Sequence, residues 1–160
     1  LNKAQSGLDV LALKKLVGSR SKEPKKAVVL SFAASYCKPC LKEIPELKKV
    51  AARFSEKGVL VAVVLRDEED EGIEQMRKLM VDELAIPFPV VSDRYSILAR
   101  RYGAEELPFL VVIDGESRVH WIHSGFREDT MANLSQRLNE LVEGKPARRL
   151  KPGNSKLRRR

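Results

Sequence analysis

The strongest constraint on the fold is a change of hydrophobic pattern around two closely spaced cysteines. Residues 27–32 form a short apolar, β-branched run of the length expected for a buried strand. After residue 40 the apolar side chains recur at steps of three and four, which is typical of one face of a helix; they are Leu41, Ile44, Leu47, Ala51 and Phe54. Cys37 and Cys40 therefore lie where a strand turns into a helix.

This position predicts a reactive pair of thiols. Cys37 falls at the N-terminus of the predicted helix, where unpaired backbone N–H groups and the helix dipole favour a negative charge. We therefore expect its pKa to be lowered and its thiolate to act as a nucleophile. Cys40 lies one turn further on, close enough to form a disulfide with Cys37 but better shielded from solvent. The chain contains only these two cysteines, so it does not use disulfides as a structural framework.

The cysteine motif resembles a known family. The stretch F-A-A-S-Y-C-K-P-C-L-K-E-I-P is similar to the active-site sequence of thioredoxin-fold thiol-disulfide oxidoreductases, and most of all to the extracytoplasmic TlpA/ResA-type group. The residues that match the group's pattern are Cys37, Pro39, Cys40, Glu43 and Pro45. Phe32 and Tyr36 stand where the family usually has Trp, which puts surface recognition in doubt but leaves the chemistry intact. The resemblance covers about residues 26–143.

The resemblance implies a second part of the site, far along the chain. In the family a cis proline precedes a core strand and packs against the disulfide; Pro108 holds this place, because it begins the apolar run 108–113. The preceding residue, Leu107, is expected to offer backbone groups to an extended substrate. The expected substrate-binding set is Tyr36, Lys38, Pro39, Leu107 and Pro108.

Glu43 has two interpretations. It falls three residues after Cys40 on the same helix face, so a buried carboxylate with a raised pKa could take the proton of the Cys40 thiol. The alternative is an exposed helix glutamate that pairs with a neighbouring lysine, such as Lys42 or Lys48. The resemblance favours the catalytic role.

Together these features predict an enzyme, a thiol-disulfide oxidoreductase with a redox-active Cys37–Cys40 disulfide and no other cofactor. The Cys37 thiolate would attack a substrate disulfide, and Cys40 would then resolve the mixed disulfide. The expected partners are protein disulfides or dithiols and a membrane-bound or soluble thiol donor. Family members usually act as reductants in cell redox homeostasis, often in cytochrome c maturation. The resemblance implies an extracytoplasmic, for example periplasmic, location; a cytoplasmic thioredoxin-like role is the alternative.

The remaining pattern predicts an α/β fold, which the resemblance identifies as thioredoxin-like. Apolar strands are expected at 59–65, 88–91 and 108–113, with a hairpin partner at 118–123. Helices are expected from the cysteine motif to about residue 56, from the acidic run 67–71 onward, at 93–102 and at 128–143. This order implies a mixed central sheet flanked by helices. Against the thioredoxin fold of the resembling family, it implies one inserted strand-helix region. The acidic run is interpreted as a solvated helix start, with substrate steering or metal binding as the alternative.

Charge divides the chain into a neutral body and a basic end. Of the 30 Lys and Arg residues, eight lie within 145–160, which leaves 22 against 22 Asp and Glu, so the net charge of +8 belongs to this end. We predict a thioredoxin-like domain at 1–144 and a disordered tail at 145–160 that could touch anionic membrane. Nucleic-acid binding is not expected, and a monomer is. The start at Leu1 is expected of a processed product that has lost a signal peptide or anchor.

Several rival functions are weighed against this interpretation. Zinc binding would need His120 and His123, but about 80 residues separate them from the cysteines, and positions three apart on a strand face opposite sides, so two surface histidines are expected. Covalent haem attachment would need His at position 41, which is Leu. A binding module with a structural disulfide remains an alternative. So does a thiol peroxidase, although the Pro- and Thr-containing loop of peroxiredoxins is missing before Cys37.

Overall fold

The computed structural model describes residues 25–144, and a five-stranded mixed sheet forms its centre. The predictions for residues 1–24 and for the basic tail lie outside the described residues. The strands are β1 (Ala27–Ala33), β2 (Val59–Leu65), β3 (Val90–Ser92), β4 (Phe109–Asp114) and β5 (Val119–Ser124), in the order β3-β2-β1-β4-β5. β1, β2 and β3 run parallel, whereas β4 is antiparallel to β1 and β5. The predicted α/β fold with a mixed sheet is therefore confirmed.

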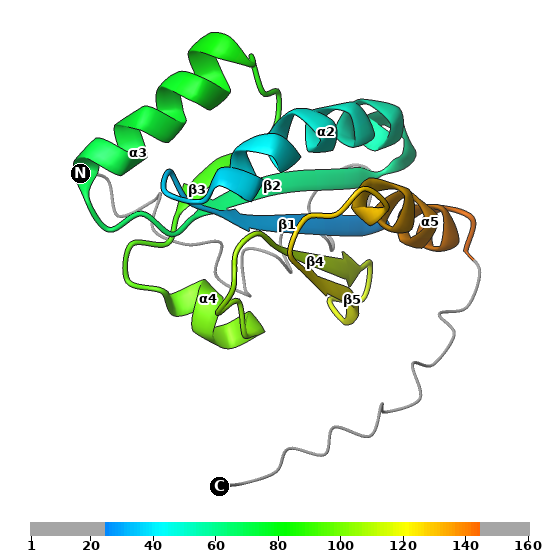
Figure 1. The fold of residues 1–160 in the computed structure, drawn as a ribbon. Helices are drawn as coiled ribbons and strands as arrows, with labels where there is room; N and C mark the ends of the chain where they lie inside the picture. The colour runs from blue at the N-terminus through cyan, green and yellow to red at the C-terminus, as the bar shows by residue number, and fades with distance from the viewer. Residues whose placement is uncertain (1–24, 145–160) are drawn as a thin grey trace, which may run out of the picture.

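Helices cover both faces of the sheet (Figure 1). They are α2 (Lys38–Phe54), α3 (Asp70–Arg77), α4 (Ile97–Tyr102) and α5 (Thr130–Val142). A 3-10 turn (Ser55–Lys57) ends α2, and π-helical turns (Lys78–Glu83) continue α3. In Figure 1, α2, α3 and α5 lie on one side of the sheet and α4 lies on the other. The region between β2 and β4, which carries α3, β3 and α4, corresponds to the predicted insertion.

The alternation of side chains along β1 builds two cores. Val29 and Ala33 belong to the cluster that packs under α2 and α5, whereas Leu30 and Phe32 belong to the cluster with the α4 residues. All residues of β1 are buried because the strand lies in the middle of the sheet with helices on both sides. Ser31 is the one hydroxyl residue of this strand and is fully buried as well. Its position becomes important for the site.

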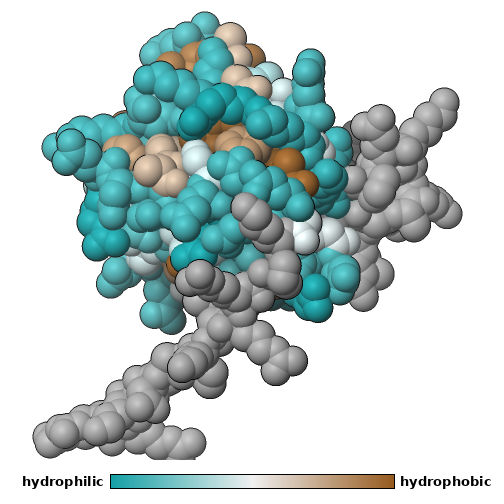
Figure 2. Space-filling view, turned by 90° about the vertical axis from the view of Figure 1, so that its right-hand side faces the viewer, coloured by the Kyte–Doolittle hydropathy of each residue, from teal (hydrophilic) through white to brown (hydrophobic). Residues whose placement is uncertain are grey.

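The hydropathy of the surface and the length of the described helices are those of a globular domain. Figure 2 shows a face that is mostly hydrophilic, with apolar side chains in several smaller areas between the hydrophilic ones. No helix within residues 25–144 is both long enough and apolar enough to span a bilayer.

Strand register gathers three loops at one end of the sheet. Ala33 at the end of β1 lies opposite Leu65 at the end of β2. On the other side, Phe32 pairs with Phe109, so Pro108 lies beside the point where β1 ends. The residues that follow β1 and β2 and those that precede β4 therefore meet at the same edge, where the cysteines are.

Candidate redox-active site

The two cysteines occupy the predicted junction between β1 and α2. Cys37 is the N-cap of α2, and its sulfur accepts the backbone N–H of Cys40 at 3.3 Å. Cys37 and Cys40 form a disulfide. Cys37 is 7% exposed and Cys40 is fully buried, as predicted from their order along the helix. A thiolate on Cys37 would therefore find a donor already in place at the positive end of the helix.

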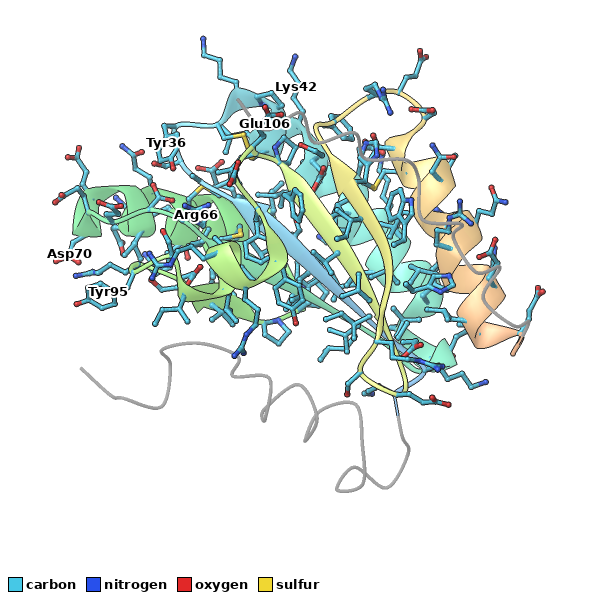
Figure 3. The ribbon with its side chains drawn as sticks, turned by 90° about the horizontal axis from the view of Figure 1, so that it is seen from below. Tyr36, Lys42, Arg66, Asp70, Tyr95 and Glu106 are labelled. Carbon is cyan, nitrogen blue, oxygen red and sulfur yellow. A yellow bond between two sulfur atoms is a disulfide. The ribbon has the colours of Figure 1, made fainter. Side chains whose placement is uncertain are left out.

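The residues around the cysteines form an exposed rim. Tyr36 is 71% exposed, and both Lys38 and Pro39 are exposed. The labelled Tyr36 and Glu106 lie at the same end of the sheet in Figure 3. A large exposed aromatic next to a buried disulfide is a surface that a substrate chain can contact while it approaches Cys37.

The peptide bond between Leu107 and Pro108 is cis, as the resemblance implied. Pro108 is buried, and its carbonyl accepts the N–H of Gly125 at 2.7 Å, which ties the start of β4 to the segment after β5. Leu107 is half-buried and packs against both hydrophobic cores. The structure thus brings the predicted residues of both halves of the site to one edge of the sheet.

Glu43 is buried within the helix layer and is not the exposed residue of the alternative interpretation. Its side chain is fully buried, and its Oε1 accepts a hydrogen bond from the Ser31 hydroxyl at 2.9 Å. The other oxygen, Oε2, has no hydrogen-bond partner. Burial raises the pKa of the Glu43 carboxyl to about 7, and the Ser31 hydrogen bond acts in the opposite direction. The prediction of a buried carboxyl with a raised pKa is confirmed; its catalytic role remains a proposal.

The structure also places Asp67 at the site, and the sequence-based prediction for this residue is wrong. Asp67 was expected to be solvated at a helix start, but α3 begins at Asp70 and Asp67 is only 3% exposed. Its carboxylate accepts the backbone N–H of Ser35 at 3.0 Å and also the Ser35 hydroxyl. The ends of β1 and β2 are also joined, because the backbone N–H of Arg66 donates to the backbone carbonyl of Ala33 at 2.9 Å. Asp67 therefore anchors the loop that delivers Cys37.

The other acids of the run behave as the sequence indicated. Glu68 and Glu69 are exposed before α3, and Asp70 and Glu71 are exposed in its first turn. Glu68, Glu69 and Glu71 line part of a cleft of about 480 Å³ that also borders Ser35 and Tyr36.

The prediction of two surface histidines facing opposite sides of their strand is wrong. A β-bulge between β4 and β5 pairs Ile113 with Val119 but Val112 with Trp121, so His120 is the extra residue. As a result both histidines reach α5: His120 contacts Glu140 at 3.3 Å and His123 contacts the Thr130 hydroxyl at 3.2 Å. Burial lowers the pKa of His123. Within residues 25–144, no group of three or more His, Cys, Asp or Glu residues is placed to hold a metal ion.

The arrangement is suited to two-electron exchange. One sulfur lies at the surface end of a helix with a stabilising N–H, and its partner is buried with a carboxyl one turn away. A group whose pKa is about 7 can both accept and return a proton near neutral pH. The two cysteines and this buried carboxyl group lie within two turns at the start of α2.

Comparison with known proteins supports this interpretation. The family profile described as "AhpC/TSA family" matches residues 11–122. The chain is 30% identical over 131 residues to the thioredoxin-like protein YneN of Bacillus subtilis, covering 80% of this chain and 74% of that protein. It is 31% identical over 117 residues to the thiol-disulfide oxidoreductase ResA of Bacillus thuringiensis subsp. konkukian, covering 73% and 64% of the two chains. The chain thus spans less than two thirds of the length of this ResA relative.

Solved structures agree with the fold. A Chlorobium tepidum protein assigned as the thiol:disulfide interchange protein DsbE is similar with a TM-score of 0.68 and 28% identity, over 81% of this chain and 84% of that one. A thioredoxin-like protein of Porphyromonas gingivalis is similar with a TM-score of 0.64 and 26% identity, over 79% and 82%. These similarities confirm the thioredoxin-like fold and the ResA-type resemblance.

Proposed function

The chain belongs to the AhpC/TSA family, and we propose that it acts as a thiol-disulfide oxidoreductase that exchanges electrons with protein disulfides through Cys37 and Cys40. The observation that carries this proposal is the disulfide itself. It joins a cysteine that caps a helix at the rim to one that is fully buried, three residues before the buried Glu43 on the same helix. The relative named thiol-disulfide oxidoreductase supports the same reaction class.

In the first step, the Cys37 thiolate attacks one sulfur of a substrate disulfide. A bond forms between Cys37 and that sulfur, the substrate S–S bond breaks, and the other substrate sulfur leaves as a thiolate that takes a proton from water. The Cys40 N–H, 3.3 Å from the Cys37 sulfur, stabilises the attacking thiolate. Tyr36, Lys38 and Pro39 would contact the substrate at the rim, and Leu107 with Pro108 would hold its extended backbone.

In the second step, Cys40 resolves the mixed disulfide. Glu43 takes the proton of the Cys40 thiol, the new thiolate attacks the Cys37 sulfur, and the second substrate thiolate leaves. The substrate has then gained two electrons and the Cys37–Cys40 pair has lost them. A thiol donor returns the pair to its reduced form.

We further propose that the protein works as a reductant outside the cytoplasm. The ResA-type resemblance supports both points, and cytochrome c maturation is one process of this kind. Labelling of Cys37 in intact cells with a membrane-impermeant thiol reagent tests the location. Labelling that requires lysis would contradict it.

Single-cysteine variants test the reaction. With dithiothreitol as donor, the wild type should reduce a protein disulfide, and C37S should be inactive because it lacks the nucleophile. C40S should form a stable mixed disulfide through Cys37, because the resolving thiol is absent. If neither variant changes the rate, the protein is a binding module with a structural disulfide. Faster consumption of peroxide than of disulfides would instead identify a thiol peroxidase.

A further inference from the structure

Glu43 is bound differently from every other buried acid of the described residues. Four carboxylates are buried there: Glu43, Asp67, Asp93 and Asp114. Asp93 accepts the backbone N–H groups at the start of α4, at 2.8 to 3.1 Å, and Asp114 accepts backbone N–H groups of its own turn at 2.9 Å. Asp67 accepts N–H and O–H from the Ser35 loop. Glu43 has a single donor, the Ser31 hydroxyl, and one oxygen with none.

Ser31 is placed for this one contact. It lies in the middle of β1, opposite Val63 of β2 and Leu110 of β4, and its side chain is fully buried. Its neighbours Val29 and Ala33 two positions away pack in the cluster under α2, so Ser31 faces the same layer. A hydroxyl in an otherwise apolar strand has a desolvation penalty unless it is hydrogen-bonded, and here the partner is Glu43 Oε1.

We propose that Ser31 is a positioning residue that holds Oε1 of Glu43 and thereby sets the pH at which Glu43 can accept the Cys40 proton through Oε2. This inference rests on the proposed thiol-disulfide exchange. It assigns a role to a strand residue that lies outside the cysteine motif.

Hydrogen bonding and burial act against each other at this carboxyl. A donor to Oε1 stabilises the ionised form, whereas the apolar surroundings destabilise it. The titratable groups that share this core are the Cys37 and Cys40 thiols at the start of α2. The described buried residues that β2, β4 and α5 place in the same cluster are apolar. Among the described residues Ser31 is therefore the one hydrogen-bond donor to Glu43, and its loss leaves the carboxyl protonated to a higher pH.

The test compares two side chains of equal size. Ser31→Thr keeps the hydroxyl and Ser31→Val replaces it by a methyl group, so damage from the extra volume is common to both. In the reduced full chain, ¹³C NMR titration of the Glu43 carboxyl should give a pKa about one pH unit higher in S31V than in S31T. The acidic limb of the rate of mixed-disulfide resolution should move by the same amount. Equal pKa values in the two variants would overturn the proposal.

A second comparison separates this role from a structural one. In the E43Q background, S31V and S31T should resolve the mixed disulfide with the same pH profile, because Ser31 acts only through Glu43. A shift that persists in E43Q would contradict the proposal. Should the larger side chains prevent folding, Ser31→Ala against the wild type gives the same comparison with only the hydroxyl removed. Absence of turnover in the wild type would refute the proposed function, whereas the NMR titration still decides the role of Ser31.

Discussion

Two buried carboxylates flank the loop that carries Cys37, and they are bound in opposite ways. Asp67 accepts both the backbone N–H and the hydroxyl of Ser35. Glu43 accepts one hydroxyl, and its second oxygen is left without a donor. A carboxylate that is fully bound fixes the groups that bind it, whereas one with a free oxygen in an apolar core can take up a proton. We infer that Asp67 stabilises the loop that carries Cys37, whereas Glu43 takes up and releases a proton at the site.

The largest expected effect concerns the pH dependence of stability. The Glu43 carboxyl has a pKa of about 7 in the folded protein, against an ordinary value of 4.5. Between these values the folded state binds the extra proton, so the free energy of unfolding falls as the pH rises, by about 3 kcal/mol in all. Glu43→Gln should remove this part of the slope, as measured by urea unfolding from pH 4.5 to 8. If the free energy of unfolding changes with pH in the same way in wild type and in E43Q, Glu43 has no raised pKa and does not differ from Asp67 in this respect.

Removal of the other carboxylate should act without this pH signature. Asp67→Ala leaves the Ser35 N–H without its acceptor in a partly buried loop, so the free energy of unfolding should fall by about 2–3 kcal/mol at neutral pH. Urea unfolding measures the loss. The matched control is Asp70→Ala, three residues further on. That side chain is 89% exposed, and within residues 25–144 its one ion pair is with Arg94 at the surface. If the two variants are equally stable, Asp67 is not an anchor.

A smaller effect is expected from the glycine that packs against this anchor. A Cβ on Gly72 in α3 would lie 2.9 Å from the Ser35 hydroxyl oxygen and closer still to the Asp67 carboxylate. Gly72→Ala should therefore destabilise by about 1 kcal/mol, although the same change in an open helix stabilises. Thermal unfolding of G72A and G72A/D67A provides the check. The glycine effect should shrink once Asp67 is gone, and an unchanged effect would mean that the clash lies elsewhere.

The sequence predicted the order of the two cysteines because that order is local. Cys37 and Cys40 lie at the start of one helix, so their spacing sets which is nearer the surface. The burial of Glu43 was favoured by the family resemblance, since spacing alone left an exposed position open. The strand at residues 59–65 was predicted with the observed bounds, since a continuous apolar run has one interpretation in the centre of a sheet. The cis bond before Pro108 followed from the family resemblance and not from the residues themselves.

The contacts that the sequence could not show are those between distant residues. Asp67 and Ser35 are 32 residues apart, and only the register of β1 against β2 brings them together. An acid in an acidic run carries no mark that distinguishes an anchor from a solvated neighbour. The bulge that turns His120 towards α5 is likewise invisible to a strict alternation of strand faces.

The most direct test of this account is the equilibrium redox titration of the Cys37–Cys40 pair, followed by thiol labelling in dithiothreitol and glutathione buffers. We predict a reversible two-electron transition with a midpoint near that of thioredoxin, about −270 mV, as expected for a reductant. A midpoint near that of DsbA, about −120 mV, would reverse the proposed direction of electron flow. A disulfide that does not cycle at all would contradict the central claim that these two cysteines are a redox centre.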